Sequence, residues 1–350
     1  MKNKFWKKYG YGFGAAICIT AFTGFALLDA FVIPRPMQVV DETTLVSQKT
    51  LNYVTETEDG GVNASASSNN GTDIDAYDDT NSGADSHGNM GEEGENPAKE
   101  NAQKDLEPLI TEDSYQDDRI SIKISTYREK NTDIFVADIM LETPDYLKTA
   151  LAKDIYGRNV TQATSEIAEN HNALFAVNGD FYGARNEGYV IRNGVLYRSA
   201  SAGNEDLVIY GDGSFGIISE DEVSAEALLE QGAVQVLSFG PALLQNSEIC
   251  VGKKDEVGRS MASNPRTAVG MIEENHYVFV VSDGRTRQSA GLSLYELADF
   301  MQGLGAETAY NLDGGGSSTM YFMGNVINHP TTGGRTMSER SVSDILYVGY

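Results

Sequence analysis

Hydrophobic and polar positions divide the chain into three stretches. Residues 11–28 are almost continuously apolar, residues 41–118 show almost no apolar periodicity, and from residue 119 to 350 short apolar runs alternate with turn residues. The first stretch has about the length that spans a bilayer, and the second is too polar to build a core. We therefore predict an N-terminal anchor in 1–40, a disordered linker in 41–118 and one folded domain in 119–350.

Strands and helices are both expected in the folded stretch. Strand patterns occur at Ile120–Ser125, Ile134–Leu141, Ala173–Val177 and Thr308–Leu312. Hairpins with Gly- or Asn-containing turns are expected at Gly188–Tyr197, Leu207–Ile218 and Thr267–Ser282. Helices are expected at Gln162–Asn170, Ser224–Gln231 and Gly291–Gly305. In the last of these, Ser293 and Glu296 have the spacing of a capping box. The pattern predicts an α+β fold with mixed and antiparallel sheets and a few covering helices.

Charge is distributed unevenly along the chain. Residues 1–9 include four lysines and no acid, which predicts a cytoplasmic N-terminus and a domain outside the cell membrane. Residues 41–118 hold 20 acidic against 3 basic residues, in a chain of net charge −25, and should form a self-repelling tether. No basic stripe is present, so nucleic acid is not an expected partner. Cys18 lies in the apolar run and Cys250 is alone outside it, so we expect no disulfide in the exported part, as suits a bacterial surface protein.

The chemically most unusual stretch is Tyr310–Tyr321, Y-N-L-D-G-G-G-S-S-T-M-Y. Three consecutive glycines are kept where the backbone approaches something closely or adopts a positive φ. Asp313 would follow a strand and lie beside free backbone N–H groups that could bind an anion; the alternative is a turn that Asp313 merely caps. Asp180 and Asp283 also follow apolar runs and adjoin glycines, so the three carboxylates could converge at one sheet edge.

Six motifs in order resemble those of the phosphodiester glycosidase family. They are V-N-G-D-F-Y at Val177–Tyr182, F-G-P-A-L at Phe239–Leu243, R-T-A-V-G at Arg266–Gly270, V-S-D-G-R at Val281–Arg285, N-L-D-G-G-G-S-S at Asn311–Ser318, and N-x-P with a later E-R at Asn328–Arg340. Together they cover roughly residues 121–350. The resemblance implies a hydrolase that cleaves the glycosidic bond of a sugar-1-phosphodiester, with a phosphorylated envelope glycan such as teichoic acid or exopolysaccharide as substrate.

This chemistry needs groups that bind phosphate and groups that support cleavage at the sugar C1 atom. The catalytic candidates are Asp180, Asp283 and Asp313, and arginine suits the phosphate because its planar fork is always charged. The substrate-binding candidates are Asn178, Arg266, Arg285, Asn311, Gly314, Gly315, Gly316, Ser317, Ser318, Asn328 and Arg340.

Three alternatives stay open. The aspartates with Asn178 or Asn311 could bind a divalent cation, Ca²⁺ or Mg²⁺. Ser317 or Ser318 could act as a nucleophile, for which His329 is the plausible neighbouring base. A non-catalytic cell-surface protein for carbohydrate binding or exopolysaccharide assembly could use the same residues, although the presence of every charged motif residue favours an enzyme.

Overall fold

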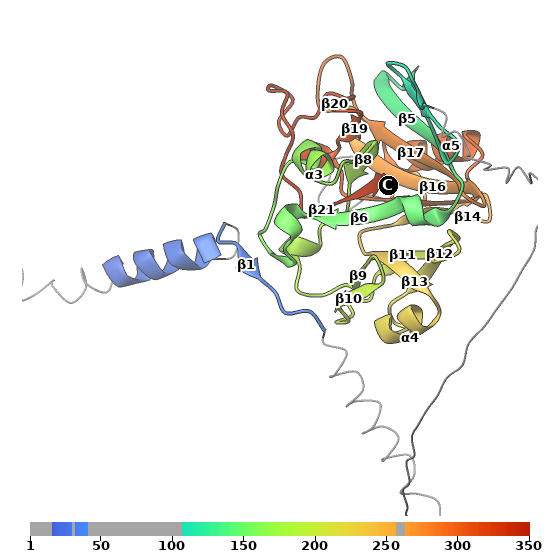
Figure 1. The fold of residues 1–350 in the computed structure, drawn as a ribbon. Coiled ribbons are helices and arrows are strands. Elements are labelled where there is room, and N and C mark those ends of the chain that lie inside the picture. Colours follow the sequence, from blue (N-terminus) through green and yellow to red (C-terminus); the bar gives the residue numbers. More distant parts are fainter. Residues whose placement is uncertain (1–15, 30–31, 41–106, 257–262) are drawn as a thin grey trace, which may run out of the picture. The chain divides into compact units, whose positions relative to one another are not determined.

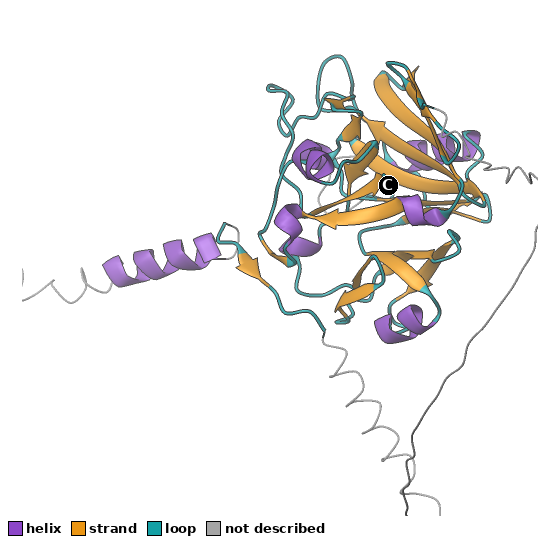
Figure 2. Cartoon of the chain, viewed as in Figure 1, coloured by secondary structure: helices purple, strands orange, loops and turns teal. Residues whose placement is uncertain are grey.

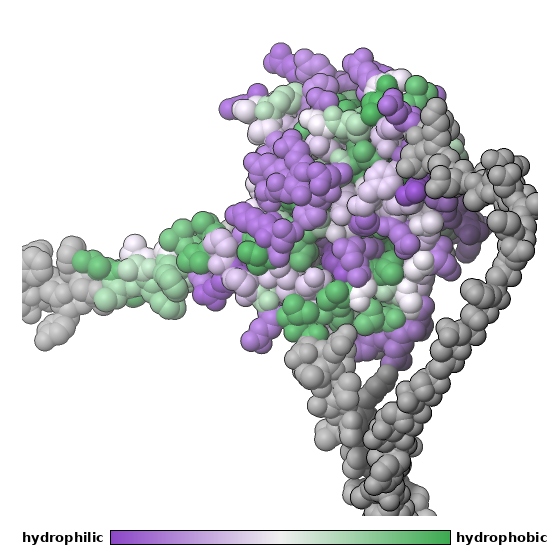
Figure 3. All heavy atoms as spheres, in the orientation of Figure 1, coloured by the Kyte–Doolittle hydropathy of each residue, from purple (hydrophilic) through white to green (hydrophobic). Residues whose placement is uncertain are grey.

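We describe the protein from a computed structural model that defines residues 16–29, 32–40, 107–256 and 263–350 (Figure 1). Residues 16–29 form a helix whose apolar side chains, such as Phe22 and Phe25, are exposed. Figure 3 shows this helix mostly in the green of hydrophobic residues. Within the described ranges, no helix is both long and apolar enough to cross a membrane. The predicted span begins at Tyr11 and so lies partly outside these ranges, as does the predicted linker up to residue 106.

The largest sheet has nine strands, and every neighbouring pair in it is antiparallel. Its order is β15 (Glu248–Ile249), β14 (Ala242–Gln245), β18 (Thr308–Asn311), β16 (Arg266–Glu273), β17 (His276–Ser282), β5 (Thr132–Leu141), β4 (Ile120–Glu129), β3 (Ser114–Gln116) and β2 (Leu109–Ile110). Since β17 and β18 each pair antiparallel with β16, they run in the same direction and end at the same edge of the sheet. This edge holds Asp283 and Asp313.

Two five-stranded antiparallel sheets and a small two-stranded one complete the strands. The second sheet has the order β20 (Asn325–Val326), β19 (Met320–Phe322), β8 (Phe175–Asn178), β21 (Asp344–Val348) and β6 (Leu147–Leu151). The third has the order β10 (Val195–Arg198), β9 (Val190–Arg192), β13 (Ala233–Leu237), β11 (Glu205–Tyr210) and β12 (Phe215–Ser219), and β1 (Arg35–Pro36) pairs with β7 (Gly157–Arg158).

The helices outside residues 16–29 are short and lie on the outside of the sheets (Figure 2). They are α3 (Thr164–Asn170), α4 (Ala225–Glu230) and α5 (Leu294–Gly303), with single 3₁₀ turns η1 (Pro144–Tyr146), η2 (Ala152–Asp154), η3 (Tyr182–Ala184) and η4 (Gly315–Ser317). Leu297 and Met301 of α5 belong to one core cluster with Leu244 and Ala309 of the nine-stranded sheet. The main core is formed by side chains from all three large sheets, such as Phe279, Phe175 and Leu207.

Several local predictions are confirmed. Ser293 and Glu296 form a capping box at the start of α5, and the three expected hairpins are β9–β10, β11–β12 and β16–β17. The predicted sheets with few helices are present, but the described strand pairs are antiparallel throughout rather than mixed, and strands dominate. The domain boundary at residue 119 is placed too late, because Leu109–Ile110 and Ser114–Gln116 already belong to the nine-stranded sheet. Their few apolar residues follow a long acidic segment, so the hydrophobic pattern did not separate them from it.

Candidate active site

Asp313 lies at the centre of a polar cluster beyond the end of β18. Its Oδ2 atom accepts hydrogen bonds from Ser317 Oγ at 2.5 Å and from Arg340 Nη2 at 3.1 Å. The Asp313 side chain is 13% exposed and that of Arg340 is 40% exposed. Burial raises the pKa of Asp313, while Arg340 and Ser317 oppose this rise. The site therefore holds a half-buried carboxylate beside a more exposed guanidinium.

The three glycines after Asp313 allow close approach of three other segments. A Cβ atom at Gly314 would lie 2.9 Å from the Pro265 carbonyl oxygen, and one at Gly316 would lie 2.4 Å from Thr332 Oγ1. Gly315 has φ +63°, and its Cβ atom would lie 2.7 Å from Arg285 Nη2. The close approach expected from the sequence is thus present at each glycine.

The predicted run of free amides is not present as such. The Gly315 N–H donates to the Pro265 carbonyl, the Ser317 N–H to the Gly314 carbonyl and the Ser318 N–H to the Gly315 carbonyl. These bonds close the η4 turn on itself and tie it to the segment before β16. The glycine loop consequently positions side chains, and the arginines are the stronger candidates for anion binding.

Arg285 is exposed beside the glycine loop. Its Nε and Nη2 donate to Asn264 Oδ1 at 3.1 and 3.0 Å, and its Nη1 donates to the Thr332 carbonyl at 2.8 Å. Burial first, and then repulsion from Arg340, lower the pKa of Arg285. Because the acceptors in these hydrogen bonds are neutral, the charge of Arg285 is not neutralised by them. Arg285 and Arg340 therefore form a positive pair next to Asp313.

Asp283 accepts hydrogen bonds from the segment that follows β20. Its Oδ1 accepts the His329 backbone N–H at 2.9 Å and the Asn328 side-chain amide at 3.3 Å, while its Oδ2 lies 2.8 Å from His329 Nδ1. Asn328 also donates to the Ser318 carbonyl at 2.9 Å. The Asp283 side chain is 5% exposed and that of His329 is 61% exposed. Asp283 thus shares the sheet edge with Asp313, as predicted, but it is engaged in orienting His329.

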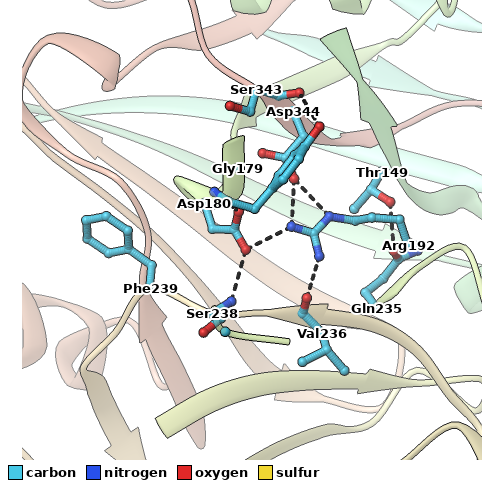
Figure 4. Close-up of polar contacts among 12 residues, drawn as sticks. Thr149, Gly179, Asp180, Arg192, Gln235, Val236, Ser238, Phe239, Ser343 and Asp344 are labelled. Atoms are coloured by element: carbon cyan, nitrogen blue, oxygen red, sulfur yellow. Dashed lines mark hydrogen bonds and ion pairs between the residues drawn. The ribbon is translucent and has the colours of Figure 1, made fainter. Parts of the chain in front are cut away.

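Asp180 does not join this cluster. Its Oδ2 atom bonds Arg192 Nη2 at 2.8 Å, and Arg192 bonds Asp344 Oδ2 on its other side at the same distance (Figure 4). The three side chains are at most 1% exposed. The Ser238 N–H also donates to Asp180. Asp180 thus forms a buried ion pair between the second and third sheets, away from the Asp313 cluster, and its catalytic role stays a prediction.

Arg266 is likewise buried rather than open to substrate. Its Nη2 lies 3.0 Å from Glu256 Oε2, and its Nε donates to the Leu292 carbonyl at 2.9 Å. Burial lowers the pKa of Arg266, and Glu256 opposes this. Because its Nε and Nη2 atoms are engaged and its side chain is buried, Arg266 is a weaker candidate for phosphate binding than Arg285.

The side-chain amides of Asn178 and Asn311 donate to the backbone around the site, whereas Asn311 Oδ1 is buried without a hydrogen-bond partner among the described residues. Asn178 Nδ2 donates to the Asp313 carbonyl at 2.7 Å, and its Oδ1 accepts from Thr267 Oγ1 at 2.8 Å. Asn311 Nδ2 donates to the Gly240 carbonyl at 2.8 Å. In the described part of the chain, no group of three or more His, Cys, Asp or Glu side chains could hold a metal ion. The predicted Ca²⁺ or Mg²⁺ site stays a prediction.

The two serines differ in their surroundings. Ser317 Oγ contacts Asp313 and also Arg340, whose Nη2 lies at 2.5 Å. The Ser318 hydroxyl is buried and has no hydrogen-bond partner among the described residues. His329 contacts Asp283 rather than either serine. The arrangement of serine, histidine and carboxylate that a serine nucleophile needs is absent from these contacts.

Arg192, Asp344 and Glu339 were not singled out from the sequence. Arg192 lies in a short strand of the third sheet, and Asp344 is 152 residues away in the second. Glu339 lies in the E-R motif, and it contacts Ser165 across 174 residues. A charged residue inside an otherwise apolar strand, as in V-I-R at Val190–Arg192 and D-I-L-Y-V at Asp344–Val348, was the signal that could have indicated a buried ion pair.

Comparisons with known proteins extend this description. The profile of the family named phosphodiester glycosidase matches residues 171–349, just over half of the chain. YomE of Bacillus subtilis, a prophage-derived uncharacterized protein, is 28% identical over 201 residues, covering 56% of this chain and 31% of YomE. Mouse N-acetylglucosamine-1-phosphodiester alpha-N-acetylglucosaminidase is 32% identical over 160 residues, covering 41% of this chain and 30% of that enzyme. The matches thus span about a third of the length of these curated relatives.

A solved structure agrees with the sequence comparisons. The catalytic domain of zebrafish N-acetylglucosamine-1-phosphodiester alpha-N-acetylglucosaminidase has a similar fold, with a TM-score of 0.52 over 66% of this chain and 83% of that domain, at 22% identity. The family match, which includes the sheet edge and the glycine loop described above, shows that the chain belongs to the phosphodiester glycosidase family.

Proposed function

We propose that this protein hydrolyses the glycosidic bond of a sugar-1-phosphodiester at the Asp313 cluster. The observation that carries the proposal is the exposed pair of Arg285 and Arg340 beside the half-buried carboxylate of Asp313. One negative charge near two positive ones leaves the cluster positive, in a chain whose net charge is −25. A local positive site of this kind is what an anionic substrate needs on an acidic protein.

In the proposed reaction, Arg285 and Arg340 bind the phosphate oxygens. A water oxygen forms a bond to the sugar C1 atom, the bond from C1 to the phosphate oxygen breaks, and its electron pair leaves with the phosphate. The proton of the attacking water passes to the Asp313 carboxylate, whose pKa is raised by burial and which is therefore a better base than an ordinary aspartate. The departing phosphate is a stable anion and needs little protonation, so one carboxylate suffices.

The proposal is tested by supplying the full-length protein with a UDP-sugar or an α-sugar-1-phosphate methyl ester and measuring the reducing sugar released. Asp313→Asn serves as the inactive control. Each assay is run with Ca²⁺ or Mg²⁺ and again with a chelator, which tests the predicted divalent cation directly. Binding of the sugar phosphate without any release, across several sugars, would favour the non-catalytic carbohydrate-binding alternative.

We further propose that the enzyme acts outside the cytoplasm on a phosphorylated envelope glycan and is held at the membrane by its N-terminal segment. The four lysines before residue 10, the apolar residues 11–28 and the exposed apolar side chains of the helix at 16–29 support this. Fractionation of cells that express the full chain tests it. Recovery of the protein in the soluble cytoplasmic fraction would contradict the proposal.

A further inference from the structure

We propose that Glu339 is a positioning residue that holds Arg340 in place for phosphate binding. The inference rests on the proposed function, because it assigns Arg340 to the phosphate. Glu339 Oε1 accepts the Ser165 backbone N–H at 3.0 Å, and its Oε2 accepts the Ser165 hydroxyl at 2.5 Å. Both contacts join the segment before Arg340 to the first turn of α3.

The start of α3 lacks a cap of its own. Its N-cap residue is Ala163, which makes no side-chain hydrogen bond to the helix. The first N–H groups of a helix have no partner inside the helix and favour a nearby negative charge. The Glu339 carboxylate takes this role from a distant part of the chain, so its own position is set by α3.

Arg340 continues from Glu339 to the site. Its backbone N–H donates to the Gly316 carbonyl at 3.3 Å, and its side chain reaches Ser317 and Asp313. One peptide unit therefore connects the start of α3 with the glycine loop. Because an arginine side chain loses considerable freedom when it is fixed, an anchor on the adjacent residue should improve anion binding by organising Arg340 before the anion arrives.

A second anchor lies on the other side of Arg340. The Val342 N–H donates to the Gln162 carbonyl at 2.8 Å, and the Gln162 N–H donates to the Val342 carbonyl at 3.0 Å. Residues 162–165 thus form hydrogen bonds with the chain on both sides of Arg340. Before Glu339 the Ser338 N–H donates to the Pro330 carbonyl at 2.8 Å, so loss of Glu339 would remove the side-chain anchor on this side while a backbone contact remains.

The experiment separates positioning from helix capping. Glu339→Ala, Glu339→Gln and Ser165→Ala are made in the full-length protein, with Ser224→Ala as the matched control. Ser224 is the N-cap of α4 and accepts the Ala227 N–H at 3.2 Å, so this variant removes a cap from another short helix. For each variant, calorimetry gives the dissociation constant of inorganic phosphate, and kinetics with the sugar phosphodiester give KM and kcat. Denaturation gives the denaturant midpoint.

We expect Glu339→Ala to raise the phosphate dissociation constant and KM by about tenfold, the size of one hydrogen bond to a charged group. Glu339→Gln keeps one acceptor and should recover part of the loss, while Ser224→Ala should lower stability without changing phosphate affinity. In an Arg340→Ala background, Glu339→Ala should have no further effect on phosphate affinity, because Glu339 acts through Arg340.

Unchanged phosphate affinity in Glu339→Ala would overturn the proposal and leave Glu339 as a helix cap. An undiminished effect of Glu339→Ala in the Arg340→Ala background would overturn it as well, as would failure of phosphate to bind the wild-type protein. Phosphate binding that depends on Glu339, without sugar release from any substrate, would instead refute the proposed hydrolysis and leave the positioning role intact.

Discussion

Replacement of Arg285 by lysine tests the phosphate site most directly. The change keeps the positive charge and removes the planar fork. Arg285 donates three hydrogen bonds to neutral acceptors, Asn264 Oδ1 and the Thr332 carbonyl, so none of its bonds is a buried ion pair whose loss would damage the fold. Its φ of +60° is no harder for lysine than for arginine. The variant should therefore fold normally.

The expected loss of phosphate affinity follows from the contacts that lysine cannot make. A hydrogen bond to a charged group contributes about 1.5–3 kcal/mol, and lysine replaces a two-point contact with a single point charge. We expect phosphate binding to weaken by about 1–3 kcal/mol, which is roughly 5- to 150-fold in the dissociation constant.

Calorimetry with inorganic phosphate measures this loss, and Arg266→Lys is the matched control. Arg266 is buried against Glu256 and the Leu292 carbonyl, so its replacement should lower the free energy of unfolding and leave phosphate affinity unchanged. Wild-type phosphate affinity in Arg285→Lys, together with a loss in Arg266→Lys at an unchanged fold, would show that the two roles are assigned the wrong way round.

Three further predictions concern the carboxylates. Asp313→Asn should reduce the turnover rate on the order of 10³-fold, because it removes the proton acceptor; near-normal turnover in a folded variant would leave Asp313 as a turn cap. Arg192→Met should lower the free energy of unfolding by about 3–5 kcal/mol, since it strands Asp180 and Asp344 without their partner; a denaturant midpoint equal to that of wild type would contradict this. Burial raises the pKa of Asp344 to about 7, above its value in the unfolded chain. The stability that this group contributes is therefore fully present below about pH 4 and is lost as the pH rises through 7, on the order of 1–4 kcal/mol. Denaturation at pH 5 and pH 8 should show this loss of stability in wild type but not in Asp344→Asn. An equal change in the free energy of unfolding between the two pH values in both proteins would refute the assignment.

Local structure could be predicted because its causes lie within a few residues. The capping box of Ser293 and Glu296 needs only a spacing of three, and the hairpin at Asn193-Gly194 needs only two residues that tolerate a positive φ. The shared edge of Asp283 and Asp313 was also predictable, since both follow apolar strands. The family motifs pointed to the correct family across the same region.

The partners of each charged residue could not be predicted, because they come from distant strands. Asp180, Asp283 and Asp313 look alike in the sequence, each beside a glycine at the end of an apolar run. Only the tertiary structure brings Arg192 to Asp180 and His329 to Asp283. It leaves Asp313 beside Arg285 and Arg340.

The glycine loop also combines a feature that the sequence determines with one that the packing determines. Three consecutive glycines by themselves determined that the backbone must be closely approached there, because no other residue tolerates such contacts. What approaches it was decided by the packing of Pro265, Arg285 and Thr332 against the loop, from three segments that the chain order does not place together. Backbone geometry is a property of a few adjacent residues, whereas the charge around a side chain depends on which sheets pack together.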